Sequence, residues 1–267
     1  DISAQLRQAQ AGASSTYAMI QQYEAAVKTQ EAQLEELRKG ARPEEIQLAE
    51  TAVDNAEKVL EDSEANLENV GNKAEVDLQQ AYNNALNVLP SAVNSGKTAL
   101  ITLTEIQYAH FSGAATDDNQ IAMAKETAMY ALLGAVNAGR WTTQYISTQN
   151  GGVYAEVQNL VLTATNEEID AVLISALDAL QKVRYALNVV PISDKLSSTE
   201  KTNLDIAKTS INNEVSIISS QQQSISVQKI TNQNSISTAE TSVNNAKNSL
   251  ATAQDQLNIK KAGSTEE

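Results

Sequence analysis

His110 is the residue best suited to acid–base or metal chemistry, because it is the only histidine among 267 residues and no cysteine is present. A zinc site needs about four nitrogen, sulfur or oxygen ligands, and neither a second histidine nor a thiolate exists to complete such a set. His110 stands beside Phe111 at a predicted helix end, where a cation interacts favourably with the helix dipole. A structural role is the stronger interpretation, and the sequence predicts no metal site and no cofactor.

Pairs of adjacent carboxylates are the next candidates, here for cation binding: Glu35/Glu36, Glu44/Glu45, Glu167/Glu168 and Glu266/Glu267. Neighbours in sequence point away from one another on a helix. Most of these pairs stand at predicted helix starts, where acidic side chains offset the positive end of the dipole. Capping and solubility therefore explain them. Neither a glycine-rich phosphate loop nor a Ser/His/Asp set can be assembled, so no catalytic residue is predicted.

A candidate contact site for a partner lies around the Gly151-Gly152 turn, which is flanked by Arg140, Trp141, Tyr145 and Tyr154. Arginine and tryptophan are favoured anchors at protein interfaces. The plainer interpretation is that these side chains close the end of a helix bundle.

Acidic residues outnumber basic ones, 33 to 19, and give the chain a formal net charge of −14. Such a surface repels phosphate backbones and anionic lipid heads, so binding to nucleic acid or to a membrane surface by charge is not expected. The hydrophobic share is 42 %, but only 4 % of the residues are aromatic. A large enzyme domain with an aromatic core is therefore not expected.

The chain is expected to be all-α, because no stretch alternates polar and apolar residues long enough to form a strand. Proline and glycine predict breaks at residues 40–43, 111–118, 151–152 and 191–194. The piece after the second break is expected to start with Asp117 or Asp118 as helix N-cap and to run to about Asn150. The next piece is expected to be interrupted where Asn166 caps a new turn, and the last to begin near Ser198.

Three tracts carry apolar or small residues at alternating spacings of three and four: residues 6–37, 46–74 and 215–257. This repeat averages 3.5 residues and predicts the seam of a left-handed coiled coil. The seams are narrow and rich in alanine, so each helix needs a partner to bury its apolar face. The middle of the chain carries broader stripes, such as Ile169, Leu173, Leu180 and Leu187, which fit the core of a helix bundle.

These patterns predict a long antiparallel coiled-coil hairpin with an inserted up-down four-helix bundle at its tip. The bundle is expected over residues 76–222, and the stalk that carries it over residues 40–75 and 223–262. Residues 1–39 are expected to form a hairpin helix whose partner lies beyond the C-terminus, and residues 263–267 to start that next helix. The chain is thus expected to be part of a longer protein.

Two short segments carry the predicted joints of the hairpin. Gly40 suits the left-handed position that ends a helix, and Pro43 suits the first position of the next helix. Residues 260–267 repeat this order with one residue fewer, and Ser264 and Glu267 have the spacing of a capping box.

With these joints the sequence resembles the membrane fusion proteins, or periplasmic adaptors, of the HlyD family. In that family a joint of the KAG-x-RPEEI kind sits on both strands of a long α-helical hairpin. Residues 34–53 match it closely, and residues 239–267 match the returning strand. The resemblance implies that a lipoyl-like domain, a β-barrel and a membrane anchor accompany the hairpin in the full-length protein. It also implies a place in the periplasm or on the extracytoplasmic face of the cell envelope.

The function that this resemblance implies is non-catalytic. Family members bridge an inner-membrane transporter of the ABC, RND or MFS type to an exit duct or the cell exterior in efflux or secretion, and they self-associate into a ring. Members that dock an outer-membrane duct of the TolC kind carry an Arg-Leu-Ser pattern in a short turn at the hairpin tip, where this chain has its predicted bundle. The bundle is expected to space the assembly, or to contact the cell wall, another protein or a ligand.

Two other classes fit parts of the pattern. An extracytoplasmic sensory four-helix bundle, like those of chemoreceptors, would place Arg140 or His110 in a polar pocket between its helices. A filament or needle coiled coil would need a continuous apolar surface. Residues beyond both ends would distinguish the adaptor from the sensor. Lipoyl-type β-segments there favour the adaptor, and a transmembrane helix followed by a signalling coiled coil favours the sensor.

Overall fold

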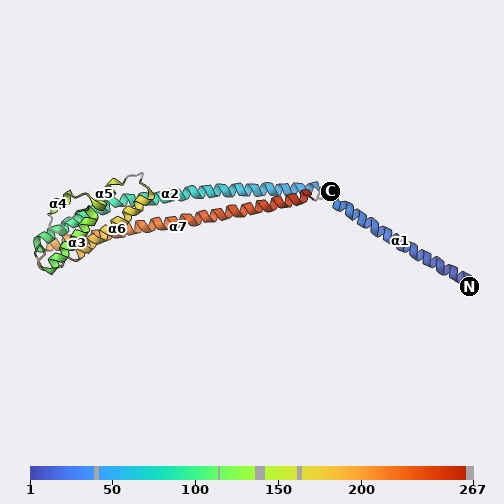
Figure 1. Ribbon diagram of the computed structural model, residues 1–267, viewed down its shortest axis with the longest axis horizontal. Helices are drawn as coiled ribbons and strands as arrows, with labels where there is room; N and C mark the ends of the chain where they lie inside the picture. The colour runs from blue at the N-terminus through green and yellow to red at the C-terminus, as the bar shows by residue number, and fades with distance from the viewer. Residues whose placement is uncertain (39–41, 114, 136–141, 161–163, 263–267) are drawn as a thin grey trace. The chain divides into compact units, whose positions relative to one another are not determined.

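The computed structural model describes residues 1–38, 42–113, 115–135, 142–160 and 164–262, and these residues form helices and connecting turns without a strand. The prediction of an all-α chain is thereby confirmed. Within these ranges the helices follow one another as α1 (Ile2–Arg38), α2 (Pro43–His110), α3 (Thr116–Leu133), α4 (Thr143–Thr148), α5 (Gly152–Asn159), α6 (Asn166–Asn188) and α7 (Ser198–Ala262) (Figure 1).

The chain divides into two compact units. The first comprises Asp1–Val70 and Ser237–Glu267, and the second comprises Gly71–Ile236, so α2 and α7 each contribute to both. Within the described ranges, none of the helices combines the length and the apolar character that crossing a bilayer requires.

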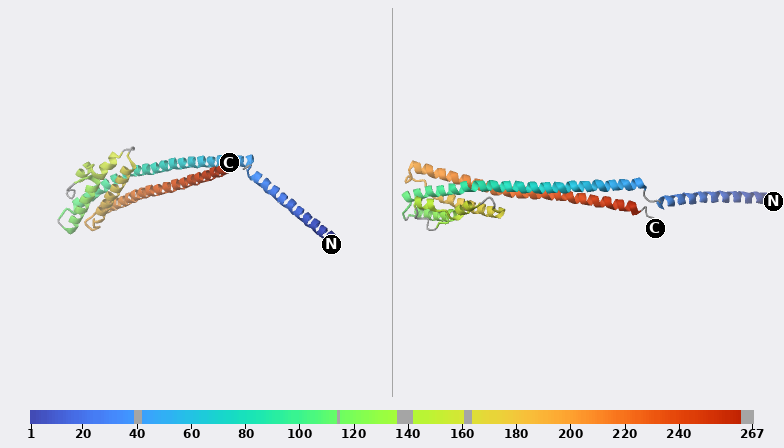
Figure 2. Two further views of the ribbon diagram at one scale, coloured as in Figure 1. Left: turned by 45° about the vertical axis from the view of Figure 1, so that its right-hand side comes forward. Right: turned by 90° about the horizontal axis from the view of Figure 1, so that it is seen from above.

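In the first unit the beginning of α2 lies beside the end of α7 (Figures 1 and 2). Three ion pairs join the two segments, at N···O distances of 2.8, 2.9 and 3.6 Å: Lys260–Glu45, Lys261–Glu50 and Lys247–Glu64. The segments are antiparallel, because Glu64 pairs with Lys247, whereas Glu45, which precedes Glu64 on α2, pairs with Lys260 near the end of α7. Exposed ion pairs contribute only about 0–1 kcal/mol each, so these pairs mark the register more than they stabilise it.

The burial pattern of this unit follows the repeat found in the sequence. Residues 42–70 are exposed except at half-buried positions, which are Ile46, Ala49, Val53, Ala56, Leu60, Ser63, Leu67 and Val70. On α7 the corresponding stripe includes Ala239, Val243 and Ala246, which are almost fully buried. Small side chains at these positions let two helix backbones approach each other closely.

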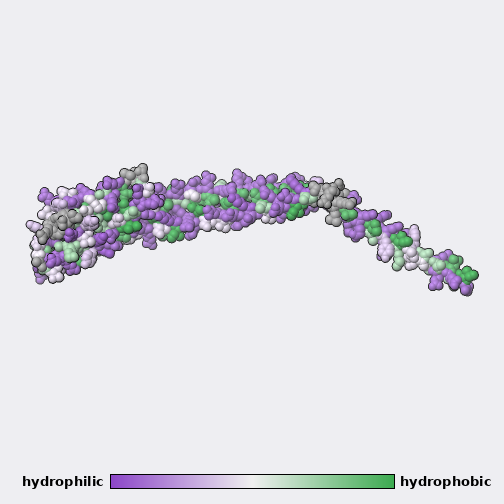
Figure 3. Space-filling view, in the orientation of Figure 1, coloured by the Kyte–Doolittle hydropathy of each residue, from purple (hydrophilic) through white to green (hydrophobic). Residues whose placement is uncertain are grey.

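Helix α1 presents its apolar stripe to solvent. All side chains of residues 1–36 are exposed, including Ile20, Tyr23, Val27 and Leu34 of the predicted seam. Figure 3 shows apolar side chains alternating with hydrophilic ones along this helix.

The second unit is built around one apolar core. It combines fully buried side chains from α2, α3, α6 and α7, among them Leu100, Leu132, Leu180 and Ile211. Helix α3 packs against both α6 and α5. Each of these core stripes repeats at three or four residues, which is why helices form here and turn one face inward.

The ends of α3 differ from the sequence prediction. The N-cap is Ala115 rather than Asp117 or Asp118, and Asp118 instead accepts a hydrogen bond from the Ala115 N–H at 3.4 Å. The helix ends at Leu133, far short of Asn150, because Gly134 adopts φ +64°. Two short helices, α4 and α5, occupy part of the stretch that was expected to continue α3.

The cap of α6 is displaced by one residue from its predicted position, whereas α7 begins at Ser198, as predicted. Thr165, not Asn166, caps α6: its Oγ1 accepts from the Glu168 N–H at 3.2 Å, and the Glu168 carboxylate accepts from the Thr165 N–H at 2.8 Å. Pro43 is the first residue of α2, as predicted. The predictions for Gly40 and for residues 263–267 lie outside the described residues.

Candidate functional site

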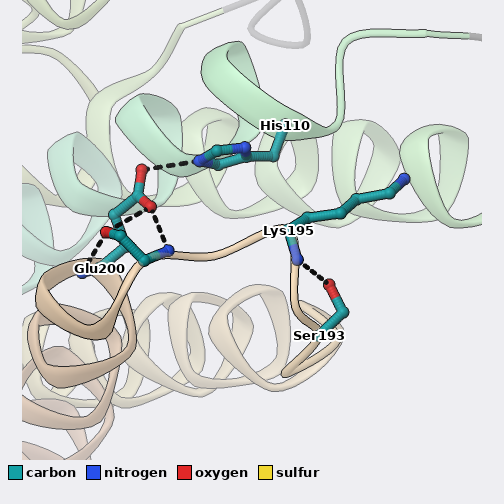
Figure 4. Close-up of polar contacts among 5 residues, drawn as sticks. His110, Ser193, Lys195 and Glu200 are labelled. Carbon is teal, nitrogen blue, oxygen red and sulfur yellow. Dashed lines mark hydrogen bonds and ion pairs between the residues drawn. The ribbon is translucent and has the colours of Figure 1, made fainter.

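His110 is the last residue of α2, and its imidazole bonds to the first turn of α7 (Figure 4). The distance from His110 Nε2 to Glu200 Oε1 is 2.8 Å. The other oxygen of Glu200 accepts hydrogen bonds from the N–H and the hydroxyl of Ser197, at 2.8 and 2.7 Å. The Glu200 N–H donates in return to Ser197 Oγ at 3.3 Å, which completes a capping box. His110 thus links the end of α2 to the cap of α7.

The surroundings of Glu200 favour its ionised form. The backbone N–H and the hydroxyl of Ser197 contribute most, and the imidazole of His110 adds to them, so the pKa of Glu200 falls to about 2. The neighbouring turn adds further contacts in the same region. The Lys195 ammonium lies 5.4 Å from the centroid of the Phe111 ring, and the Lys195 N–H donates to Ser193 Oγ at 3.3 Å.

The order of the groups in this cluster does not suit nucleophilic catalysis. In a Ser-His-acid triad the imidazole lies between the hydroxyl and the carboxylate and takes the hydroxyl proton. Here the carboxylate of Glu200 lies between Ser197 and His110. The arrangement supports the structural interpretation of His110.

The carboxylate pairs have other partners. Glu45 accepts a hydrogen bond from Lys260, which lowers the pKa of Glu45, and Glu168 caps α6. Glu36 lies 3.8 Å from the Arg42 guanidinium. Glu266 and Glu267 lie outside the described residues. Across the part of the chain that the structure describes, no three or more His, Asp or Glu side chains are grouped so as to hold a metal ion.

Two of the four candidate contact residues around the glycine turn can be placed. Tyr145 lies on α4 with 44 % of its surface exposed, and Tyr154 lies on α5, where it packs partly against the core. Arg140 and Trp141 lie outside the described residues.

Lys97 attaches the α4–α5 turn to α2. Its ammonium donates to the Gln149 carbonyl and to Asn150 Oδ1, both at 2.9 Å, and lies 4.6 Å from the centroid of the Tyr154 ring. Tyr154 therefore serves the packing of this turn, whereas Tyr145 remains open to solvent.

A polar contact between residues that lie far apart in the sequence joins three helices. Tyr82 on α2 is fully buried, and its hydroxyl donates to Asp170 Oδ2 on α6 at 2.9 Å. Lys229 on α7 donates to the same oxygen at 2.8 Å. Its hydrogen bonds with Asp170 and, second, with Tyr82 raise the pKa of Lys229. Asp170 is 88 positions from Tyr82 and 59 from Lys229, so no local spacing could reveal the contact.

Two buried charged side chains were also missed. Glu214 accepts hydrogen bonds from the hydroxyls of Ser91 and Ser95 at 3.3 and 2.8 Å. Lys125 on α3 is only 1 % exposed, and burial lowers its pKa to about 8. Because a charge taken out of water loses its hydration, Lys125 reduces the stability of the second unit at neutral pH.

Comparison with known proteins identifies no relative: no family model, no curated protein and no solved structure matches the chain.

Proposed function

We propose that this chain is the helical part of a membrane fusion protein, a non-catalytic adaptor that bridges an inner-membrane transporter to an exit duct or the cell exterior. In this proposal residues 40–75 and 223–262 form an antiparallel coiled-coil stalk. Residues 76–222 form a four-helix bundle inserted at its tip. The protein acts in the periplasm or on the extracytoplasmic face of the envelope, by spacing, by self-association into a ring and by contact with its partners.

The pairing of two tracts that lie far apart in sequence carries this proposal. The Lys260–Glu45 and Lys247–Glu64 ion pairs join the start of α2 to the end of α7. A narrow stripe of half-buried residues runs along the same stretch of α2. Two helices paired through so thin a seam provide length rather than a binding cavity, which suits a spacer.

The exposed stripe of α1 gives further support. An amphipathic helix of this length needs a partner to bury its apolar face. In the proposal that partner is the helix that begins after residue 267, so that the hairpin continues beyond the joints.

A sensory bundle is the alternative. It would use His110 or Arg140 to bind a polar ligand, but the His110 imidazole already contacts Glu200 at 2.8 Å. The described residues therefore favour the adaptor.

An export assay in the organism that carries the gene tests the proposal. Cells without the gene are compared, over a panel of dyes and secreted proteins, with cells complemented by the full-length protein carrying Val243→Asp or Val59→Asp. Val243 is 5 % exposed and Val59 is 54 % exposed, so the same change buries a carboxylate in the first case only. We expect Val243→Asp to destabilise the helix pair by about 3 kcal/mol and to abolish export.

The control variant Val59→Asp should restore export fully at an equal protein level. Unchanged export of every panel member after deletion of the gene, or full complementation by Val243→Asp, would overturn the adaptor role.

A further inference from the structure

The outer face of α6 carries a second stripe with three–four spacing, in addition to the stripe that fills the core. Its members are the exposed residues of this helix from position 171 onward: Ala171, Ile174, Asp178, Gln181, Tyr185 and Asn188. Ile174 and Tyr185 leave 63 % and 56 % of their surfaces in solvent. A three–four repeat is the spacing by which one helix packs along another, so this face has the pattern of a second helix contact.

The stripe is symmetric about its centre. The symmetry is one of position along the helix, since each residue lies as far from the centre as its counterpart. The counterparts are Ala171 and Asn188, Ile174 and Tyr185, and Asp178 and Gln181. If a second α6 lies antiparallel across this face, Ile174 of each copy is level with Tyr185 of the other. Lys182 is then within one residue, or about 1.5 Å along the axis, of the level of Asp178 in the other copy.

The charges of Asp178, which belongs to the stripe, and of Lys182, which lies beside it, fit the same symmetry. Asp178 and Lys182 are one helical turn apart and form an ion pair of 2.6 Å within the chain. Across an antiparallel contact each Lys182 also approaches Asp178 of the second copy, so opposite charges meet twice. A surface that complements itself in this way is what a two-fold contact requires.

The neighbouring helix α3 extends the apolar surface. Met123 on α3 is 69 % exposed and lines, together with Tyr185, a groove of about 400 Å³ between α3 and α6. Tyr130, seven positions further along α3, is 61 % exposed. Among the residues that the structure describes, Asp178 and Lys182 are the charged ones that line the groove, so their charges cancel, whereas the whole chain carries −14. Two copies of so acidic a chain repel each other over most of their surface, and least where the charges cancel.

We propose that two copies of this chain associate through their α6 helices, which pack antiparallel along the stripe from Ala171 to Asn188. The contact is two-fold and places Asp178 of each copy beside Lys182 of the other. It stands independently of the adaptor role, because it depends only on the surface of the second unit.

Sedimentation equilibrium on the 267-residue chain, from about 1 μM to about 1 mM, measures the association. We expect a monomer–dimer equilibrium that either Asp178→Lys or Lys182→Asp weakens by at least about tenfold, because like charges then face each other. The double variant that exchanges the two residues restores opposite charges across the contact and should restore the dimer. Lys73→Asp is the matched control, since it breaks the corresponding ion pair between Lys73 and Asp77 on α2.

Cross-linking tests the direction of the contact, because the chain contains no cysteine of its own. In the antiparallel pair, Gln181→Cys places two thiols at levels about 4.5 Å apart along the axis, whereas Asn188→Cys places them about 25 Å apart. A short bifunctional thiol reagent should link the first variant and not the second. Purely monomeric behaviour, failure of the exchange variant to recover the dimer, or linkage of both cysteine variants would each overturn the proposal.

Discussion

At the scale of single residues, Glu200 shows how one carboxylate can connect two helices. One of its oxygens completes the cap of α7, and the other contacts His110 at the end of α2. Each bond favours the ionised carboxylate, which is why its pKa falls from 4.5 to about 2. Such a group stabilises the folded state above its unfolded pKa and loses that contribution as the pH falls toward its folded pKa.

The replacement Glu200→Gln should therefore destabilise the second unit at pH 6 and lose this effect in acid. We expect the gap in urea midpoint between wild type and variant to narrow as the pH falls from about 4.5 to about 2, because the wild-type carboxylate is protonated over that range. The same exchange at Glu68, an exposed carboxylate on α2, serves as the control. A gap that stays constant with pH would contradict the account given for Glu200.

Individual residues were predicted well where a local rule decides and poorly where distant residues meet. Pro43 was placed correctly, since its ring fits only the first turn of a helix. The cap of α6 was assigned to Asn166 although Thr165 has the capping-box partner Glu168 three positions later. Lys125 lies four positions after Ile121 and three before Ala128, so the apolar spacing of α3 places it on the buried face, although a lysine by its charge predicts an exposed position.

At the scale of elements, two backbone segments approach each other closely where α3 ends and α5 begins. The Gly151 N–H donates to the Leu133 carbonyl at 3.0 Å, and Gly134 and Gly152 have φ values of +64° and +55°. A Cβ atom on Gly134 would lie 2.7 Å from the Gly152 nitrogen. Both the left-handed conformation and the short distance require glycine here.

Two glycine-to-alanine variants should consequently act in opposite directions. Gly134→Ala should destabilise the second unit by about 2–4 kcal/mol, because it adds strain and a clash with backbone atoms. Gly71→Ala should stabilise α2 by about 0.5–1 kcal/mol, since Gly71 lies inside the helix and, apart from the adjoining helix backbone, no atom of the described residues lies within 4 Å of the added Cβ. Urea unfolding of both variants gives the comparison, and equal effects would refute this reading of the turn.

The helical elements themselves were predictable because their repeats are long and regular. The half-buried positions of residues 42–70 coincide with the three–four repeat of the sequence. The repeat over residues 215–257 departs from the structure at Lys229, which it places on the seam. Lys229 is instead exposed and pairs with Asp170, and the neighbouring Gln228 is half-buried. The end of α3 at Leu133 was not predicted, because the apolar pattern does not show that Gly134 is left-handed. The close approach of the α5 backbone to Gly134 accounts for this conformation.

At the scale of the whole molecule, the two units differ in how they bury apolar surface. The second contains a large fully buried core, whereas the nearly complete burial in the described part of the first is confined to Ala239, Val243 and Ala246. Segments with few buried contacts open at lower free energy than a packed core.

Hydrogen exchange should therefore distinguish the units. We expect amides of residues 43–70 and 237–262 to exchange before those of the core segments of α3 and α6, and amides of α1, with its exposed side chains, to exchange first. Mass spectrometry of peptic fragments measures this order. A single common rate for both units would show that they unfold together and would contradict the expectation.

The antiparallel pairing of residues 43–70 with residues 237–262 limits how these segments can change in length during evolution. An insertion between Glu50 and Glu64 on α2 alone changes the distance between the two along the helix. These carboxylates can then no longer both reach their partners on α7, Lys261 and Lys247. Insertions or deletions of seven residues in both tracts keep the contacts and alter the span by about 10 Å. Lineages that need a longer or shorter version should therefore differ by matched heptads on the two sides.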